Sequence, residues 1–370
     1  MKVKNIVTTV VFCLLIFGFF VLCLLHKPVE MSESERRPLA QFPEISWQGV
    51  ASGETIGDFD DYTVDQFPFR EAFRKLYTWY RFNVVNIKET NGFAEEDGYI
   101  AKVDTELCQP SLDKVINKFS AIYEQLLKDS NGKVYLSIIP DKNYFFSKEY
   151  GHLSIDYDKL VTAMRDGLPM MEYIDIFDTL ALDDYYKTDT HWSQEKIAET
   201  VNRIAAALGC ADRISGDYKI NTLYPFYGVY HAQSALDLPA DTIYYLTNEI
   251  IDACTVFDYE TNQTFPIYTL EKFESKEPYD IFLGGTKALL RIDNPNATEQ
   301  KELVVFRDSF GSSLIPLLAE GYSSIYVVDI RYVDSSLLGM MGINFENADT
   351  LFLYSTLIIN SNPSFKEFGQ

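Results

Sequence analysis

Hydrophobic and polar positions along this 370-residue chain follow three patterns. The first is an apolar run of 20 residues without a charge, Ile6 to Leu25, which is long enough to cross the hydrocarbon core of a bilayer as a helix. The second is helical spacing of apolar residues, which predicts helices within residues 73–84, 111–127 and 193–209. The third is an alternation of short apolar strands and helices near the C-terminus.

The strand-and-helix units predict the fold class. Strands are predicted at 133–140, 170–177, 302–308, 323–330 and 349–355, with helices at 311–321 and 335–342 between the last three. Strands that alternate with helices favour a mostly parallel sheet with helices on both faces, which is an α/β fold. Between about 210 and 300 the pattern weakens, because tyrosines and turn residues interrupt short strand-like runs such as "DTIYYL" and "YDIFLGG".

Three segments are predicted along the chain. Residues 1–26 are predicted to be a signal anchor, since Lys2 and Lys4 precede the apolar run and no small-residue cleavage site follows it. A cleaved signal peptide is the alternative, and both interpretations place the body of the protein outside the cytoplasm. Residues 27–57 mix Pro, Ser, Gly and charges without a period and are predicted to be a tether. Residues 58–370 are predicted to form one domain, with a tyrosine-rich inserted region at about 210–300.

The predicted extracytoplasmic part is strongly acidic. Residues 27–370 carry 30 basic and 54 acidic residues, a net charge of −24. This excess argues against nucleic acid and other anionic polymers as partners, because binding them relies on Lys and Arg. The cysteines outside the apolar run, Cys108, Cys210 and Cys254, form no C-x-x-C motif and allow one disulfide at most. These spacings predict no metal site and no cofactor.

A serine follows one of the predicted strands at a sharp turn. In "LVVFRDSFGSSL", Ser309 lies between a strand and a helix, where open α/β sheets form their sites. Free backbone N–H groups at a helix N-terminus can hold the oxyanion of a tetrahedral intermediate. The arrangement resembles a nucleophile elbow without its G-x-S-x-G sequence. A plain helix N-cap is the alternative interpretation.

The segment "TDTHWS" supplies a candidate base for this serine. Histidine is the usual general base near neutral pH, and His191 is one of four in the chain. Asp189, two residues earlier, projects to the same side of an extended segment, so it is placed to hold the imidazole in one tautomer. The alternative is a histidine and an aspartate in a polar loop. Together with Ser309, the pair predicts a Ser–His–Asp triad.

Several blocks of the sequence resemble the DHHW family, which is related to the exported SGNH-like O-acetyltransferases, including the alginate O-acetylation proteins. The blocks are "ESERRPLAQFPEIS", "YTVDQFPFRE", "IPDKNYF", "TDTHWS", "LGGTKALLRIDN" and "FRDSFGSSLIPLL", in this order over about residues 30 to 360. The resemblance implies an SGNH-like three-layer α/β/α catalytic domain and a triad of Ser309, His191 and Asp189. Thr190 stands where the family name has a second histidine, and the usual SGNH oxyanion motifs are not visible.

Other residues are weaker candidates for the site. Asp141 and Lys142, in "PDKN" after a predicted strand, are expected to orient a substrate or the loop that carries the histidine, with a type I turn as the alternative. Gly285 in "LGGT" is a candidate oxyanion donor, with a simple turn as the alternative, and Arg307 is a candidate substrate contact. His231 is a rival base, but no acidic residue lies two positions before it.

Three functions compete at this point. The resemblance implies an extracytoplasmic, membrane-anchored O-acetyltransferase or esterase that acts on a cell-surface or exported polysaccharide. It also implies that a membrane-bound O-acyltransferase delivers the acetyl groups. A non-catalytic, glycan-binding scaffold is the first alternative. A metal-dependent hydrolase built on Asp189, His191 and Asp141 is the second, and it is disfavoured because no second histidine lies nearby.

Overall fold

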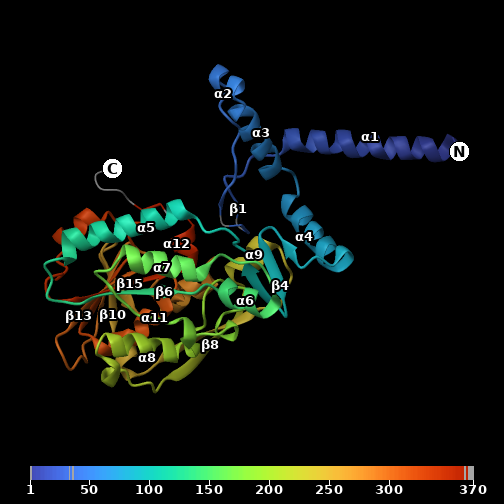
Figure 1. Cartoon of the computed structure of the whole chain (residues 1–370). Helices are drawn as coiled ribbons and strands as arrows, with labels where there is room; N and C mark the ends of the chain where they lie inside the picture. Colours follow the sequence, from blue (N-terminus) through green and yellow to red (C-terminus); the bar gives the residue numbers. More distant parts are fainter. Residues whose placement is uncertain (1, 33, 36, 362–363, 366–370) are drawn as a thin grey trace. The chain divides into compact units, whose positions relative to one another are not determined.

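The computed structural model describes residues 2–32, 34–35, 37–361 and 364–365 (Figure 1). Its contacts divide the chain into two compact units, residues 1–91 with 231–237 and residues 92–230 with 238–370. The sequence instead suggested a tether over 27–57 and a domain that starts at residue 58, and those boundaries stay predictions.

The larger unit is built on an eight-stranded sheet. Five neighbouring strands run parallel, and three more extend one edge in antiparallel fashion. The order across the sheet is β11 (Gln263–Pro266), β10 (Thr255–Asp258), β12 (Leu289–Asp293), β14 (Ser324–Val328), β13 (Glu302–Arg307), β15 (Asp349–Ser355), β6 (Val134–Ile139) and β7 (Glu172–Tyr173). The predicted α/β fold with a mostly parallel sheet is confirmed.

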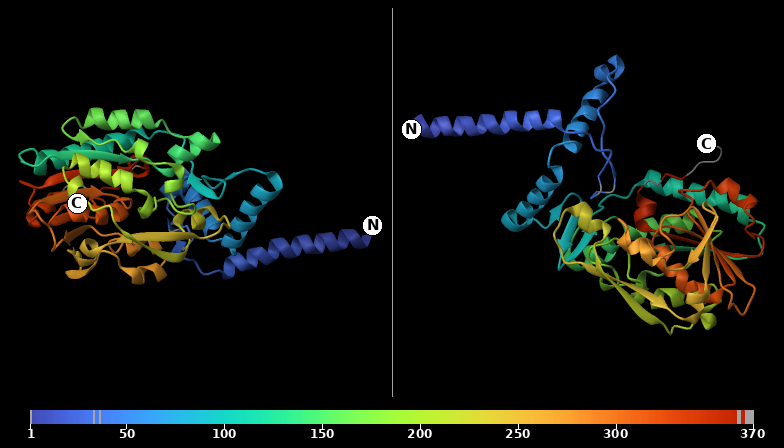
Figure 2. Two further views of the ribbon diagram at one scale, coloured as in Figure 1. Left: turned by 90° about the horizontal axis from the view of Figure 1, so that it is seen from below. Right: turned by 180° about the vertical axis from the view of Figure 1, so that it is seen from behind.

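Helices cover both faces of this sheet, as Figures 1 and 2 show. Alternate residues of a strand point to opposite faces, so Leu303 and Val305 of β13 pack with α8 (Ala198–Ala207) and α11 (Gly311–Leu318). Val304 and Phe306 face the other way. They pack with α5 (Gln109–Ile122), α7 (Tyr157–Gly167) and α12 (Thr356–Asn360). The result is the predicted three-layer α/β/α arrangement.

Smaller elements complete the larger unit. They are the hairpin β4 (Phe93–Glu96) and β5 (Tyr99–Lys102), the helix α6 (Lys142–Tyr150), the pair β8 (Lys219–Phe226) and β9 (Asp241–Thr247), and the helix α10 (Glu249–Ala253). The short helix α9 (Val229–Ser234) crosses the division between the two units.

Some predicted elements change type or length. The predicted strand at 170–177 shortens to β7, and the predicted helix at 335–342 is a 3-10 helix, Ser335–Met340. The helix predicted at 193–209 opens with a 3-10 turn, Gln194–Lys196, before α8. The strand-like run "YDIFLGG" is not a strand: a 3-10 helix, Pro278–Ile281, leads into three residues with positive φ. A strand cannot accommodate those φ values.

The smaller unit begins with α1 (Lys2–Leu25), which has no buried residues and is long and apolar enough to cross a membrane. A signal sequence at an N-terminus has the same properties. The unit also contains the pair β1 (Met31–Ser32) and β2 (Arg37–Pro38), helices α2 (Trp47–Ser52), α3 (Glu54–Asp65) and α4 (Arg70–Tyr80), a π-turn, Arg81–Val85, and β3 (Glu89–Thr90). The aperiodic sequence did not predict α2, which lies inside the expected tether. Ser46 caps this helix by accepting a hydrogen bond from the N–H of Gly49 at 3.0 Å.

Candidate active site

Asp189 and His191 lie in a tight loop that two backbone hydrogen bonds close. The N–H of Tyr186 donates to the carbonyl of His191 at 3.1 Å, and the N–H of Ser193 donates to the carbonyl of Asp184 at 2.7 Å. Within the loop, Oδ1 of Asp189 accepts a hydrogen bond from the N–H of His191 at 3.0 Å. This Asx turn brings the two side chains together. The sequence pattern predicted that an extended segment would place Asp189 and His191 on the same side. The two side chains do lie together, but a turn and not an extended segment brings them there.

The two side chains form a continuous hydrogen-bonded line with Ser309. Oδ1 of Asp189 is 2.6 Å from Nδ1 of His191, and Nε2 of His191 is 2.8 Å from Oγ of Ser309. An ionised carboxylate can only accept a hydrogen bond, so Nδ1 of His191 carries the proton and donates to Asp189, which leaves Nε2 free to accept a hydrogen bond from the hydroxyl of Ser309. The arrangement therefore has the connectivity of a Ser–His–Asp triad.

Ser309 lies on the turn between β13 and α11, at the carboxyl end of a parallel strand. Its neighbour Asp308 is fully buried and holds the turn. Oδ1 of Asp308 accepts from the N–H of Phe310 at 3.1 Å, and Oδ2 accepts from both the N–H and the hydroxyl of Ser355 at 2.7 and 2.6 Å. Because Ser355 ends β15, these bonds tie the turn that carries Ser309 to the adjacent strand.

The N–H of Ser309 donates no hydrogen bond to the described part of the chain. It lies at the N-terminal end of α11, where the helix dipole favours negative charge. This N–H is therefore available to an oxyanion on a substrate attached to Ser309.

Two aromatic rings hold the imidazole of His191 in place. The ring of Tyr279 stacks on it with centroids 3.9 Å apart and an interplanar angle of 4°, and the ring of Phe310 lies at 4.9 Å. The hydroxyl of Tyr279 and Nε1 of Trp192 both hydrogen-bond to Oγ of Ser313, at 2.8 and 2.9 Å. The sequence did not indicate Tyr279, because no local pattern relates residue 279 to residue 191.

Asp189 is buried and its carboxylate is fully hydrogen-bonded. Burial by itself raises the pKa of Asp189, but the charge and hydrogen bond of His191 and the N–H groups of His191 and Val229 outweigh it and lower the pKa to about 2. The Val229 N–H donates to Oδ2 at 2.8 Å. The site thus keeps the carboxylate ionised throughout the neutral and mildly acidic range.

This lowered pKa predicts a pH effect on stability. A carboxylate with a depressed folded-state pKa stabilises the protein above its unfolded pKa, 3.8, and loses that contribution as the pH falls toward 2. We expect the difference in free energy of unfolding between the wild type and Asp189→Asn to shrink by about 1–2 kcal/mol from about pH 5 to about pH 2.5. Urea titrations at each pH measure it, and a constant difference would contradict the assignment.

The side chain of Lys142 is hydrogen-bonded to the backbone of the loop that carries Asp189 and His191. Only 1% of the residue is exposed. Its Nζ donates to the carbonyl of Ile100 at 2.8 Å, to that of Lys187 at 3.2 Å, and to that of Asp189. Burial lowers the pKa of Lys142 to about 7, against the opposing charges of Asp189 and Asp241. The lysine contacts the loop backbone, and its role in orienting the loop stays a prediction.

Substituting this lysine is expected to loosen the loop. Lys142→Met fills the same volume but removes the lysine donor from the buried carbonyls of Ile100 and Asp189, so we expect a loss of about 2 kcal/mol or more in stability and at least about a tenfold loss of turnover. Urea unfolding and kinetics with an acetyl ester measure the two effects. Lys148→Met, an exposed position on the same helix, is the matched control and is expected to change neither. Wild-type turnover in Lys142→Met would contradict this role.

Gly228 allows the tyrosine-rich region to approach the loop closely. A Cβ on this residue would lie 2.3 Å from Cβ, 2.4 Å from Cα and 2.6 Å from N of Asp189. The N–H of Gly228 also donates to Oγ1 of Thr188 at 3.0 Å, next to the bond between Val229 and Asp189. The sequence did not indicate a role for Gly228, because a glycine between tyrosines is typical of a turn.

We expect Gly228→Ala to displace Asp189, because the methyl group meets the backbone of the loop. A displacement of about 1 Å is enough to lower turnover by about 10²-fold, and overpacking costs about 1–3 kcal/mol of stability. The matched control is Gly57→Ala on α3, where no heavy atom lies within 4 Å of the new Cβ. If the Gly228→Ala and Gly57→Ala variants turn over substrate at the same rate, the close approach of Gly228 to Asp189 is not needed for activity.

The remaining predicted site residues have structural partners. Asp141 caps α6 and accepts hydrogen bonds from the hydroxyls of Tyr157 and Thr356 at 3.0 and 2.6 Å. The N–H of Gly285 donates to the carbonyl of Phe282 at 3.2 Å, so that group is engaged within its own turn.

Arg307 and His231 are placed differently. The side chain of Arg307 is buried; Nη2 lies 3.5 Å from the carbonyl of Gly285, and Nη1 lies 4.0 Å from Asp329. His231 belongs to the other unit of the chain. Cys108, Cys210 and Cys254 are free thiols. Within the described residues, no group of three or more His, Cys, Asp and Glu side chains is arranged to hold a metal.

The comparisons with known proteins agree with the resemblance read from the sequence motifs. The family model described as "DHHW protein" matches residues 179–328, a span that includes Asp189, His191 and Ser309. No curated protein matches the sequence significantly.

Solved structures show the same fold at low sequence identity. A DHHW family protein from Eubacterium siraeum superposes with a TM-score of 0.57 at 18% identity, covering 75% of this chain and 98% of that one. PatB1 from Bacillus cereus, solved with a sulfonyl adduct, gives 0.59 at 18% identity and covers 74% of this chain and 98% of that one. The predicted resemblance to the DHHW family is therefore confirmed over residues 179–328, and the chain shares the fold of these two solved structures.

Proposed function

We propose that this protein is a membrane-anchored, extracytoplasmic serine acyltransferase or esterase that moves acetyl groups on a cell-surface or exported polysaccharide. The observation that carries the proposal is the line of hydrogen bonds from Asp189 through His191 to Ser309. The match of residues 179–328 to the DHHW family model supports it. The acidic surface supports a neutral or weakly charged acceptor, because an anionic polymer would be repelled.

The proposed reaction is a two-step acyl transfer. His191 removes the hydroxyl proton of Ser309, whose Oγ attacks the acetyl carbonyl, and the N–H of Ser309 stabilises the oxyanion. The leaving group departs with the proton from His191, and Asp189 stabilises the imidazolium in between. In the second step, His191 removes the proton of a sugar hydroxyl or water, whose oxygen attacks the acetyl carbonyl, and the imidazolium returns that proton to Oγ of Ser309 as the ester bond to the serine breaks.

We propose that the acetyl groups come from a membrane-bound O-acyltransferase partner, with α1 holding the catalytic unit at the membrane. The length and apolar character of α1 support the anchor. The two lysines before the apolar segment support an orientation with the larger unit outside the cytoplasm.

Mass spectrometry of the acyl-enzyme tests the chemistry. The protein is mixed with an activated acetyl ester, quenched and digested, and we expect one acetyl group on the peptide that contains Ser309. Ser312→Ala, at a buried serine on the helix that follows Ser309, is the matched control and is expected to be labelled like the wild type. A sulfonyl fluoride is the second probe, chosen because PatB1 has been solved with a sulfonyl adduct. Labelling that persists in Ser309→Ala would overturn the assignment.

The fate of the acetyl group separates the two reaction types. Candidate oligosaccharides that speed its loss from Ser309 and appear acetylated identify a transferase, whereas loss to water alone identifies an esterase. The competing function, a glycan-binding scaffold, predicts the opposite pattern. It requires glycan binding that survives in Ser309→Ala and no acetyl-ester turnover in the wild type.

A further inference from the structure

Helix α4 is packed with its apolar face outward. Phe73, Leu76, Tyr77 and Tyr80 follow the i, i+3, i+4, i+7 spacing of one helix face, and they are 43–58% exposed. The opposite face is polar and packed against the rest of its unit. Thr78 is 1% exposed and donates to the carbonyl of Ser234 at 3.3 Å.

Ionic and polar contacts fix this orientation. Nη2 of Arg74 donates to the carbonyl of Gln233 at 2.6 Å, and Nη1 of Arg70 forms an ion pair with Glu35 at 2.5 Å. Rotating the helix to bury its apolar face would break these contacts. The outward orientation of the apolar face is therefore fixed by specific contacts and does not result from loose packing of the helix.

The apolar surface continues beyond α4. Trp79, on α4 itself, is 56% exposed. Val84 and Val85 in the π-turn and Ile87 after it are 39–58% exposed. Contiguous apolar surface of this kind is uncommon on a soluble protein and marks a contact with a membrane or another protein.

The charge of the same segment is opposite to that of the rest of the protein. Residues 70–88 carry five basic residues, Arg70, Arg74, Lys75, Arg81 and Lys88, against a single acidic residue, Glu71. The body of the protein has a net charge of −24. A positive segment with exposed Trp and Tyr is typical of a helix that lies in the interface of an anionic bilayer.

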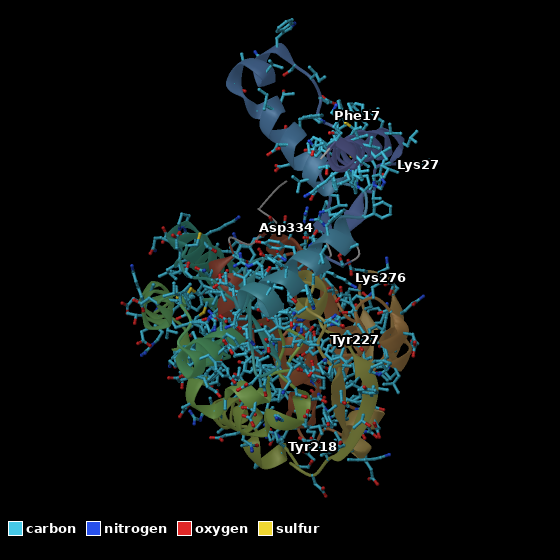
Figure 3. The ribbon with its side chains drawn as sticks, turned by 90° about the vertical axis from the view of Figure 1, so that its right-hand side faces the viewer. Phe17, Lys27, Tyr218, Tyr227, Lys276 and Asp334 are labelled. Carbon is cyan, nitrogen blue, oxygen red and sulfur yellow. The ribbon has the colours of Figure 1, made fainter. Side chains whose placement is uncertain are left out.

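The start of α4 also contacts the predicted membrane helix. The ring of Phe19 in α1 stacks on Phe67 with centroids 5.6 Å apart and lies 5.9 Å from the ring of Phe73. Phe19 is six residues before the end of α1, about 9 Å along the helix axis. The side chains of α1, Phe17 among them, project freely from the helix (Figure 3). A residue at the level of Phe19 is thus close to the apolar region of the bilayer that α1 enters.

We propose that α4 and the turn after it form a second membrane contact, lying in the interface of an anionic phospholipid bilayer with Phe73, Leu76, Tyr77, Trp79 and Tyr80 toward the acyl chains. The proposal rests on the proposed anchor α1 and adds a contact that the anchor does not require. Lys75 and Arg81 lie at the headgroups. The contact holds the smaller unit against the bilayer instead of leaving it on a free tether.

Quenching by brominated lipid tests the contact on the full-length protein. The chain has three tryptophans: Trp79 on the proposed face, Trp47 on α2 at 89% exposed, and Trp192, which is fully buried. The protein is reconstituted in vesicles of phosphatidylcholine and phosphatidylglycerol, with and without bromine on the acyl chains. We expect the Trp79 part of the emission to fall at least about twofold, as for a ring at the boundary of headgroups and acyl chains.

Two conservative variants assign the signal. In Trp79→Phe, the part of the tryptophan emission that brominated lipid quenches is expected to disappear. In Trp47→Phe, this part of the emission is expected to remain. Charge reversal in Lys75→Glu/Arg81→Glu is expected to reduce quenching in anionic vesicles more than in pure phosphatidylcholine.

The outcomes separate this contact from the anchor. Flotation of the protein with the vesicles reports insertion of α1, whereas quenching reports α4. Flotation without Trp79 quenching would overturn the proposal and would indicate that a protein partner or a second copy covers the face. Equal quenching in the wild type and Trp79→Phe would overturn it as well.

Discussion

Ser309→Ala is expected to abolish acetyl-ester turnover and to leave the fold intact. Oγ of Ser309 lies 2.8 Å from Nε2 of His191, which is proposed to remove its proton. An alanine has no group that replaces this hydroxyl. In enzymes with this constellation, removing the nucleophile lowers kcat by about 10⁶-fold, with a residual rate from the oxyanion donors and binding alone. Steady-state hydrolysis of an activated acetyl ester measures the effect.

Two comparisons make the result specific. Ser312→Ala is expected to keep wild-type kcat, and the thermal unfolding curve of Ser309→Ala is expected to match that of the wild type. A Ser309→Ala protein that is folded and turns over the ester at the wild-type rate would eliminate the proposed mechanism.

Asp189→Asn is expected to lower kcat by about 10⁴-fold, with the acetyl-ester KM nearly unchanged. An asparagine amide placed toward Nδ1 of His191 donates a hydrogen bond where the carboxylate accepts one. The imidazole then carries its proton on Nε2, which faces Ser309, so it cannot act as the base. The remaining amide oxygen still accepts the N–H of Val229, whereas the bond from the N–H of His191 to the former Oδ1 is lost. The two backbone bonds that close the loop do not involve the side chain, so the loop is expected to persist.

The matched control is Asp183→Asn, whose side chain lies in the preceding 3-10 turn and is 74% exposed. We expect it to leave kcat unchanged. A mass-spectrometric time course with Asp189→Asn is expected to show slow acetylation of Ser309 and not an absence of binding. Wild-type acetylation rates in Asp189→Asn would show that the carboxylate only stabilises the loop.

The sequence predicted the central sheet well where each strand is apolar throughout. β15 is buried along its whole length and β13 from Leu303 to Arg307, and such runs can be recognised because helices cover both sheet faces. The antiparallel extension of β12, β10 and β11 was not predicted. Its strands are short and separated by turns, so their apolar pattern does not differ from that of an irregular region.

The candidate triad was predicted because its members carry local signals. Ser309 follows a buried strand directly, and Asp189 precedes His191 by two residues. The residues that hold them in place were missed or left without a defined role, since their partners are remote in sequence. Lys142 lies 47 residues from Asp189, and Tyr279 stacks on the ring of a residue in another part of the chain.

Chemical identity and local periodicity were sufficient to determine the apolar N-terminal helix, the acidic body, the α/β class and the candidate nucleophile, base and orienting carboxylate. Only the tertiary structure decided that the imidazole of residue 191 meets the hydroxyl of residue 309, and that α4 presents its apolar face outward. The physical reason is the range of the interactions. Burial and backbone hydrogen bonding within a helix or strand produce a periodic pattern of residue types in the local sequence. A contact between residues more than a hundred positions apart depends instead on how the sheet and its loops are assembled.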